Sequence, residues 1–151
     1  MQPLRRRDAE TDAEKKIGMD EEDDILERFD SGLTESIIGC CIEVHRVLGP
    51  GLTEAMYEAA LCHEMDLRGR RYQRQVEIPV AYKGKPIGKG IIDLIVDGKV
   101  IVELKACESI TSVHRAQLIC YLKVSRLQLG LLINFNVPVL KDGIRRIIQT
   151  N

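Results

Sequence analysis

Residues 88–106 read GKGIIDLIVDGKVIVELKA and contain two runs of Ile, Val and Leu separated by an Asp-Gly pair. Such runs on either side of Asp-Gly predict two antiparallel strands joined by a tight turn. The first run carries Asp93, and the second carries Glu103 and Lys105. Because charged groups inside apolar strands cost stability unless they find partners, the relative position of these three side chains decides the interpretation.

The alternation of side chains along a strand predicts which residues of this hairpin meet. The even-numbered residues of both runs are apolar, whereas the odd-numbered positions hold every charge. A single apolar face requires an odd number of residues in the connection, for instance three with a glycine bulge at Gly98, because a two-residue turn would mix the faces. In that register Asp93 and Glu103 are opposite or diagonal neighbours, and Lys105 follows on their face.

Two neighbouring carboxylates raise each other's pKa unless a cation lies between them. Oxygen ligands without His or thiolate partners suit Mg²⁺ or Mn²⁺, and Lys105 would project toward the same water or phosphate. A solvent-facing surface network of Asp93, Glu103 and Lys105 explains the same pattern without a metal.

The other elements follow from hydrophobic periodicity, caps and turn residues. We expect helices over 34–48 (with Thr34 as the N-cap), 53–68 and 111–125, strands over 72–82 and 127–135, and a last short element after 141–143. This order predicts an α/β fold, with a mixed β-sheet whose central antiparallel meander is flanked by helices.

Charge divides the chain into two parts. Residues 1–30 carry 6 basic and 11 acidic side chains, which predicts an acidic, flexible N-terminal tail. Residues 31–151 carry a net charge of +4 and are expected to form a single domain. This mildly basic domain permits a polyanionic partner. Its basic positions fit either a phosphate-tracking rim or, more simply, a solvated surface, and they are Arg68, Arg70, Arg71, Arg74, Lys83, Lys85 and Lys89.

The five cysteines form no C-x-x-C pair. They predict buried free thiols in a reducing, cytoplasmic environment and disfavour a zinc or iron–sulfur site. No run of apolar residues is long enough to predict a membrane span.

Three motifs together resemble a known superfamily. Asp93 on one strand and Glu103-x-Lys105 on the next resemble the PD-(D/E)XK nucleases, although Ile92-Asp93 stands where Pro-Asp is common. Residues 117–121, QLICY, resemble the QxxxY motif of the RecB-like branch. Residues 51–58, GLTEAMYE, resemble the signature of the GxxExxY proteins. The resemblance covers about residues 31–149 and implies a restriction-endonuclease-like αβββαβ core.

The resemblance implies that Asp93 and Glu103 bind Mg²⁺ or Mn²⁺, with the carbonyl of Leu104 as a third ligand. Lys105 would orient the attacking water or stabilise charge on the phosphate. The implied activity is metal-dependent hydrolysis of phosphodiester bonds in nucleic acid, with DNA favoured over RNA.

Four further residues receive roles from the resemblance. Glu54 or Glu58 would be the acidic ligand on the first core helix, although acids in a first turn also favour the helix dipole. Gln117 would hold Lys105 or the substrate, and Tyr121 would pack at the site or touch the nucleic acid. A polar helix stripe facing solvent explains Gln117 equally well.

Two other functions remain open at this level. One is a catalytically silent nuclease-fold module that binds nucleic acid or protein, and the other is a phosphodiesterase acting on a small nucleotide. A homodimer would suit the cutting of two strands.

Overall fold

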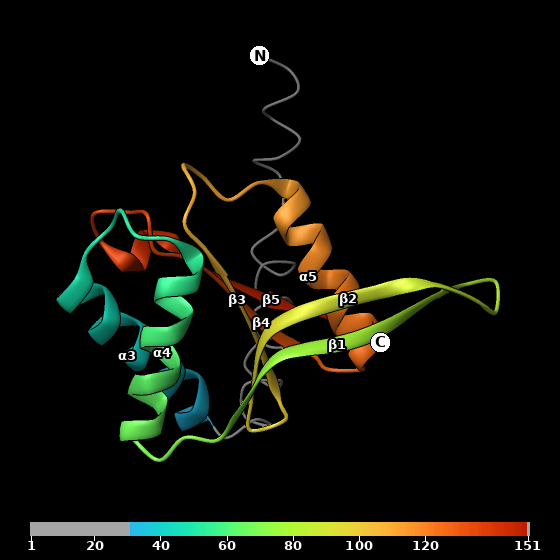
Figure 1. The fold of residues 1–151 in the computed structure, drawn as a ribbon, viewed down its shortest axis with the longest axis horizontal. Coiled ribbons are helices and arrows are strands. Elements are labelled where there is room, and N and C mark those ends of the chain that lie inside the picture. The colour runs from blue at the N-terminus through green and yellow to red at the C-terminus, as the bar shows by residue number, and fades with distance from the viewer. Residues whose placement is uncertain (1–30, 151) are drawn as a thin grey trace, which may run out of the picture. The chain divides into compact units, whose positions relative to one another are not determined.

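The computed structural model describes residues 31–150, which form a five-stranded sheet with helices on both sides (Figure 1). The helices are α3 (Ser31–Leu48), α4 (Glu54–Leu67), α5 (Ser112–Ser125) and the short 3₁₀ helix η1 (Leu140–Gly143). The strands are β1 (Tyr72–Tyr82), β2 (Lys85–Val96), β3 (Val100–Lys105), β4 (Leu129–Asn134) and β5 (Ile144–Ile148). The acidic tail expected at residues 1–30 lies outside the described residues.

The strands follow one another in space in the order β1-β2-β3-β4-β5. All neighbours are antiparallel except β3 and β4, which are parallel and joined through α5. Figure 1 shows α5 on one side of the sheet and α3 and α4 on the other. This mixed α/β sheet with its antiparallel β1–β2–β3 meander confirms the expected fold class and is consistent with a restriction-endonuclease-like core.

The connection between β2 and β3 has three residues, as the parity argument required. Val96 pairs with Val100 and Leu94 pairs with Val102. Asp97 and Gly98 have φ angles of 52° and 67°, and the Lys99 N–H donates to the Val96 carbonyl at 3.0 Å. Both residues therefore take the left-handed backbone that an Asp-Gly turn favours, while Lys99 supplies the extra residue that keeps the apolar faces in register.

The expectation that all even positions of β2 share one face is wrong at Ile92. Ile92 packs in the cluster under α5 together with Ile95 and Ile101, and a Cβ on Gly90 would lie 2.7 Å from the Tyr121 ring of that helix. The side chains of β2 therefore change faces between Ile92 and Ile95, because the strand is irregular at Asp93. Because helices cover both faces of the sheet, Ile95 and Ile101 are buried although they are odd-numbered.

Hydroxyl caps define two of the three helix starts. Thr53 accepts a hydrogen bond from the Met56 N–H, and Thr111 accepts one from the His114 N–H, both at 3.3 Å. His114 returns the bond, since its Nδ1 accepts from the Thr111 N–H at 3.1 Å. The expectation that Thr34 is an N-cap is wrong, because α3 already includes Ser31 and Thr34 lies buried inside the helix, where its hydroxyl has no hydrogen-bond partner among residues 31–150.

The loop between α3 and α4 is fixed by Tyr57. Its hydroxyl donates to the Gly49 carbonyl at 2.5 Å and accepts from the Leu52 N–H at 3.2 Å. The ring is fully buried and stacks on Phe135 with 4.4 Å between centroids. This anchoring sets the start of α4, and with it the positions of Glu54 and Glu58.

All five cysteines are free. Cys40, Cys41 and Cys62 are buried, as expected, but Cys107 is half-buried and Cys120 is exposed on the outer face of α5. The expectation of burial is therefore wrong for Cys120, since its apolar neighbours in sequence face the sheet while it does not. No helix within residues 31–150 is long and apolar enough to cross a membrane.

Candidate active site

Asp93 and Glu103 face each other where β2 and β3 stop pairing through their backbones. The Asp93 N–H donates to Glu103 Oε1 at 3.0 Å, and the Leu104 N–H donates to Asp93 Oδ2 at 2.9 Å. Each carboxylate thus accepts a backbone hydrogen bond from the opposite strand. The two acids are therefore built into the sheet and are not a mobile surface pair.

The environment of this pair disfavours two negative charges. Burial raises the pKa of Glu103 to about 8, with the charge of Asp93 as the next cause. Burial also raises the pKa of Asp93, although the hydrogen bond from Leu104 opposes that rise. Glu103 is only 4% exposed. Such a pair favours an additional positive charge, because a cation between the carboxylates would stabilise both in the ionised form.

Lys105 follows Glu103 at the end of β3 and is half-buried. Its positive charge lowers the pKa of both Asp93 and Glu103, although less than burial raises them. Within residues 31–150 we find no hydrogen bond or ion pair that engages its ammonium group. Lys105 is thus close enough to the acids to affect their charge and free to bind a further anion.

Glu58 reaches the site from α4 and is only 7% exposed. Its Oε2 pairs with Arg74 Nε at 2.9 Å, and its Oε1 accepts a hydrogen bond from Gln75 Nε2 at 2.5 Å. The amide nitrogen of Gln75 also lies 3.4 Å from Asp93 Oδ1. Gln75 therefore connects the acid on the helix with the acid on β2. Each oxygen of Glu58 thus accepts one hydrogen bond within the protein and keeps a lone pair for a further ligand.

The backbone of β1 is distorted at Gln75. Its φ angle is 52°, and the regular pairing of β1 with β2 skips Gln75 although Arg74 pairs with Leu94 and Val76 with Ile92. Successive side chains of a strand normally point to opposite faces, yet Arg74 and Gln75 reach the same carboxylate. The left-handed conformation, which costs a non-glycine residue about 1–2 kcal/mol, makes this possible.

Sequence reasoning missed Gln75, and it named Arg74 only as part of a possible phosphate-tracking rim and not beside the acids. A signal was present, because Gln73, Arg74 and Gln75 are three successive polar residues in a segment otherwise predicted to alternate. Such a run indicates that the strand does not keep one face buried throughout. It does not reveal the positive φ angle.

Glu54 is exposed in the first turn of α4 and lines a hollow beside the acidic pair. The hollow has a volume of about 240 Å³ and is lined by Glu54, Ala55, Glu58, Gln75, Asp93 and Leu104. The structure thus brings Glu54, Glu58 and Asp93 to one depression. No three His, Cys, Asp or Glu side chains of residues 31–150 are grouped closely enough to form a preassembled metal cluster.

The two predicted residues of α5 occupy different surroundings. Tyr121 is half-buried and its ring packs against Gly90 of β2, where a Cβ would collide with it. Gln117 is exposed, one turn earlier on the helix, and makes no hydrogen bond to Lys105 within the described residues. Tyr121 therefore packs against the sheet, which is one of the two roles expected for it. A role for Gln117 requires a bound substrate.

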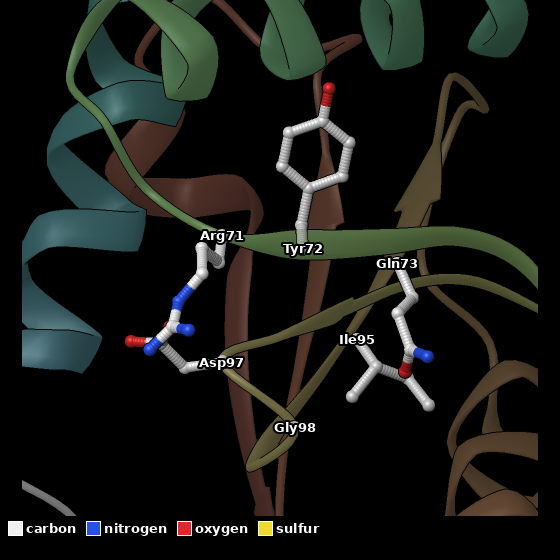
Figure 2. A pocket seen from close by; sticks show the side chains of 6 residues that line it. All are labelled: Arg71, Tyr72, Gln73, Ile95, Asp97 and Gly98. Atoms are coloured by element: carbon white, nitrogen blue, oxygen red, sulfur yellow. The ribbon is translucent and has the colours of Figure 1, made fainter.

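A second hollow, of about 470 Å³, lies at the C-terminal end of β2, around the β2–β3 turn (Figure 2). It is lined by Arg71, Tyr72, Gln73, Ile95, Asp97 and Gly98. Figure 2 shows Arg71 beside Asp97, whose carboxylate lies 3.9 Å from Arg71 and 3.3 Å from Arg70. Because Arg70 and Arg71 both pair with Asp97 around the β2–β3 turn, we do not assign chemistry to this hollow.

A five-stranded mixed sheet with Asp93 and Glu103-x-Lys105 on adjacent strands is the arrangement expected of a nuclease of the PD-(D/E)XK class. Residues 31–147 match the model of the PD-(D/E)XK nuclease superfamily, and the chain belongs to that superfamily. The comparison with curated proteins found no match. Members of this superfamily generally use divalent metal ions and act on nucleic acid, which fits the oxygen-only ligands of this site.

Proposed function

We propose that this protein is a Mg²⁺- or Mn²⁺-dependent nuclease that hydrolyses phosphodiester bonds of DNA, and that it belongs to the GxxExxY group within its superfamily. The observation that carries the proposal is the facing pair of Asp93 and Glu103, whose pKa values are raised by burial and by the charge of neighbouring carboxylates. Lys105 beside the pair completes the set of residues that phosphodiester hydrolysis needs.

The donor set suits a hard divalent cation. Asp93 and Glu103 would bind it, with the Leu104 carbonyl, and Mg²⁺ commonly needs only one or two carboxylates because water and phosphate oxygens complete its shell. Glu54, exposed in the hollow, would bind it directly or through water, and Glu58 is the alternative acid. When bound, the cation supplies charge neutralisation at the scissile phosphate and lowers the pKa of the attacking water.

The chain's own residues would perform the remaining tasks. Lys105 would donate to the phosphate and stabilise the negative charge that develops on its oxygens. Gln75 would hold Asp93 in place through its amide, and Arg74 would hold the carboxylate of Glu58 in place through their ion pair. Gln117 would contact the substrate or Lys105 once DNA is bound, and Tyr121 would support the β2 backbone next to Asp93.

Two broader features are part of the proposal. A homodimer would place two such sites on the two strands of a duplex. Cys40, Cys41 and Cys62 are buried free thiols, which suits a reducing cytoplasm.

Cleavage assays on single-stranded and double-stranded DNA with Mg²⁺ or Mn²⁺ test this function. We expect Asp93→Asn and Glu103→Gln to reduce the cleavage rate at least about 100-fold, the scale of losing one transition-state contact. Glu108→Gln, which removes an exposed acid after β3, is the matched control and should cleave at the wild-type rate. DNA binding without cleavage by the wild type would instead identify a catalytically silent module.

A further inference from the structure

The outer part of the β1–β2 hairpin projects beyond the other helices and strands of residues 31–150 (Figure 1). We call residues 79–89 the arm. Every residue from Ala81 to Lys89 is exposed, including the apolar side chains of Tyr82 (61%) and Ile87 (64%). Eleven- and twelve-residue strands that leave their tip without support are longer than the core requires. The arm is therefore free to contact a partner.

The charge of the arm indicates the kind of partner. Lys83, Lys85 and Lys89 lie in a stretch from Ile78 to Ile92 that contains no Asp or Glu. Among contacts with residues 31–150, only Lys89 is paired, to Glu77 at 2.9 Å at the base of the arm. Lys83 and Lys85 at the tip face no acid within the described residues, so a polyanion is the partner that their charge favours.

Strand pairing with a second copy is disfavoured by the same segment. β1 is an edge strand, and edges are protected from other strands by prolines, bulges and lysines. The arm has all three features: Pro79 and Pro86, a shift of register between Val80 and Ala81, and the tip lysines. Two copies would also bring like charges together.

The position of the arm relative to the acidic pair fits a duplex. Lys85 precedes Asp93 by eight residues on β2. At about 3.3 Å per residue the strand covers about 26 Å, which equals about eight base-pair steps of 3.4 Å. A two-stranded β-ribbon fits the major groove of B-form DNA. Single-strand binding would need several stacking aromatics, and the arm has only Tyr82, whose ring lies 5.3 Å from Lys83 Nζ.

We infer that the arm tracks the backbone of a DNA duplex whose scissile phosphate lies at Asp93 and Glu103, with Lys83 and Lys85 contacting phosphates about eight base pairs away. This inference rests on the proposed nuclease function, and it specifies the duplex as substrate.

The test compares the wild type, Lys83→Ala/Lys85→Ala and Lys99→Ala/Lys141→Ala. The last variant removes the same charge from two exposed lysines outside the arm. Affinity for a 30-base-pair duplex is measured by fluorescence anisotropy across a salt series in metal-free buffer, which prevents cleavage. The logarithm of the binding constant falls with the logarithm of the salt concentration, and each phosphate contact contributes about 0.9 to the steepness of that fall. We therefore expect the arm variant, which loses two contacts, to have a slope that is less steep by about 1.8. The control should bind as the wild type does.

Cleavage with Mn²⁺ is measured on the long duplex and on one too short to reach the tip. We expect the arm variant to cleave the long duplex more slowly at limiting DNA and the short one at the wild-type rate. An unchanged salt slope in an actively cleaving protein would overturn the arm inference and leave the nuclease function standing. An equal loss of slope on single-stranded DNA would overturn the duplex assignment. A reduced slope without any cleavage would support the arm and contradict the nuclease.

Discussion

Among single residues, Lys105 has the clearest separable role. Asp93 and Glu103 hold each other through backbone hydrogen bonds, so either substitution disturbs the sheet as well as the charge. Lys105 is half-buried at the end of β3 and its ammonium has no structural partner among residues 31–150. A substitution there should change chemistry with little effect on folding.

We therefore predict that Lys105→Ala reduces kcat by about 100-fold or more with little change in Mn²⁺ affinity. Because the Lys105 charge lowers the pKa of Asp93 and Glu103, its removal should also shift the acidic limb of the pH–rate profile upward. Steady-state cleavage across pH tests both effects. Lys105→Arg, which keeps the charge, should leave the acidic limb in place.

Among single residues, the sequence predicted the positions that follow from the alternation of side chains along a strand. The facing of Asp93 and Glu103 followed from the alternation of apolar and charged positions and from the need for a three-residue connection. Arg74 and Gln75 could not be found in the same way, because their approach to Glu58 depends on one positive φ angle. The exposure of Gln117 could not be predicted either, since it depends on how α5 is rotated against the sheet.

Among the elements, β1 contributes more than an edge to the sheet. Its distortion at Gln75 lies opposite Asp93, where the side chains of β2 also change faces. Non-glycine residues in such conformations cost free energy and are concentrated at functional sites. The distortion brings Arg74 and Gln75 together at Glu58.

Two variants separate the backbone effect from the side-chain effect. Gln75→Gly and Gln75→Ala both remove the amide, but only glycine accepts the φ angle of 52° without strain. We predict that Gln75→Gly is more stable than Gln75→Ala by about 1 kcal/mol, while both weaken Mn²⁺ binding equally. Urea denaturation and calorimetry give the two quantities. Equal stability of the two variants would contradict the left-handed backbone at Gln75.

Most element boundaries were predictable from local chemistry. Thr53, Thr111 and Gly69 mark helix ends that the structure confirms, and the strand over residues 72–82 was predicted with its observed limits. Thr34 was assigned as a cap because it precedes an apolar periodic run. The helix instead begins earlier, since Ser31 is already part of α3.

At the scale of the whole molecule, the acidic pair should make stability depend on pH. The folded protein raises the pKa of Glu103 from 4.5 to about 8, so it binds a proton more tightly than the unfolded chain does. The contribution of Glu103 to stability is then greatest below pH 4.5, decreases as the pH rises toward 8, and changes little above it.

We predict that the metal-free protein loses free energy of unfolding between about pH 5 and pH 8, and that Glu103→Gln loses less. Chemical denaturation in the presence of a chelator measures this difference. Mn²⁺ should stabilise the wild type at pH 8, because a ligand that binds only the folded state raises its stability. If the free energy of unfolding depended on pH in the same way for the wild type and Glu103→Gln, folding would not raise the pKa of Glu103, which would contradict the prediction.

The overall topology was predictable because hydrophobic period, turn residues and caps agreed along most of the chain. The change of faces at Ile92 was not, since it arises from the irregular pairing of β1 with β2. The arm was also not predicted as a separate feature, because the length of a hairpin beyond its core depends on which strands lie beside it.

The central claim is that Asp93 and Glu103 together bind a divalent cation. Calorimetric titration of Mn²⁺ into the wild type, Asp93→Asn, Glu103→Gln and the control Glu108→Gln tests it most directly. We predict one site in the wild type and the control, with a proton released on binding below pH 8 because the ligands must ionise, and at least tenfold weaker binding in the other two. Equal binding by all four proteins, without proton release, would contradict the claim.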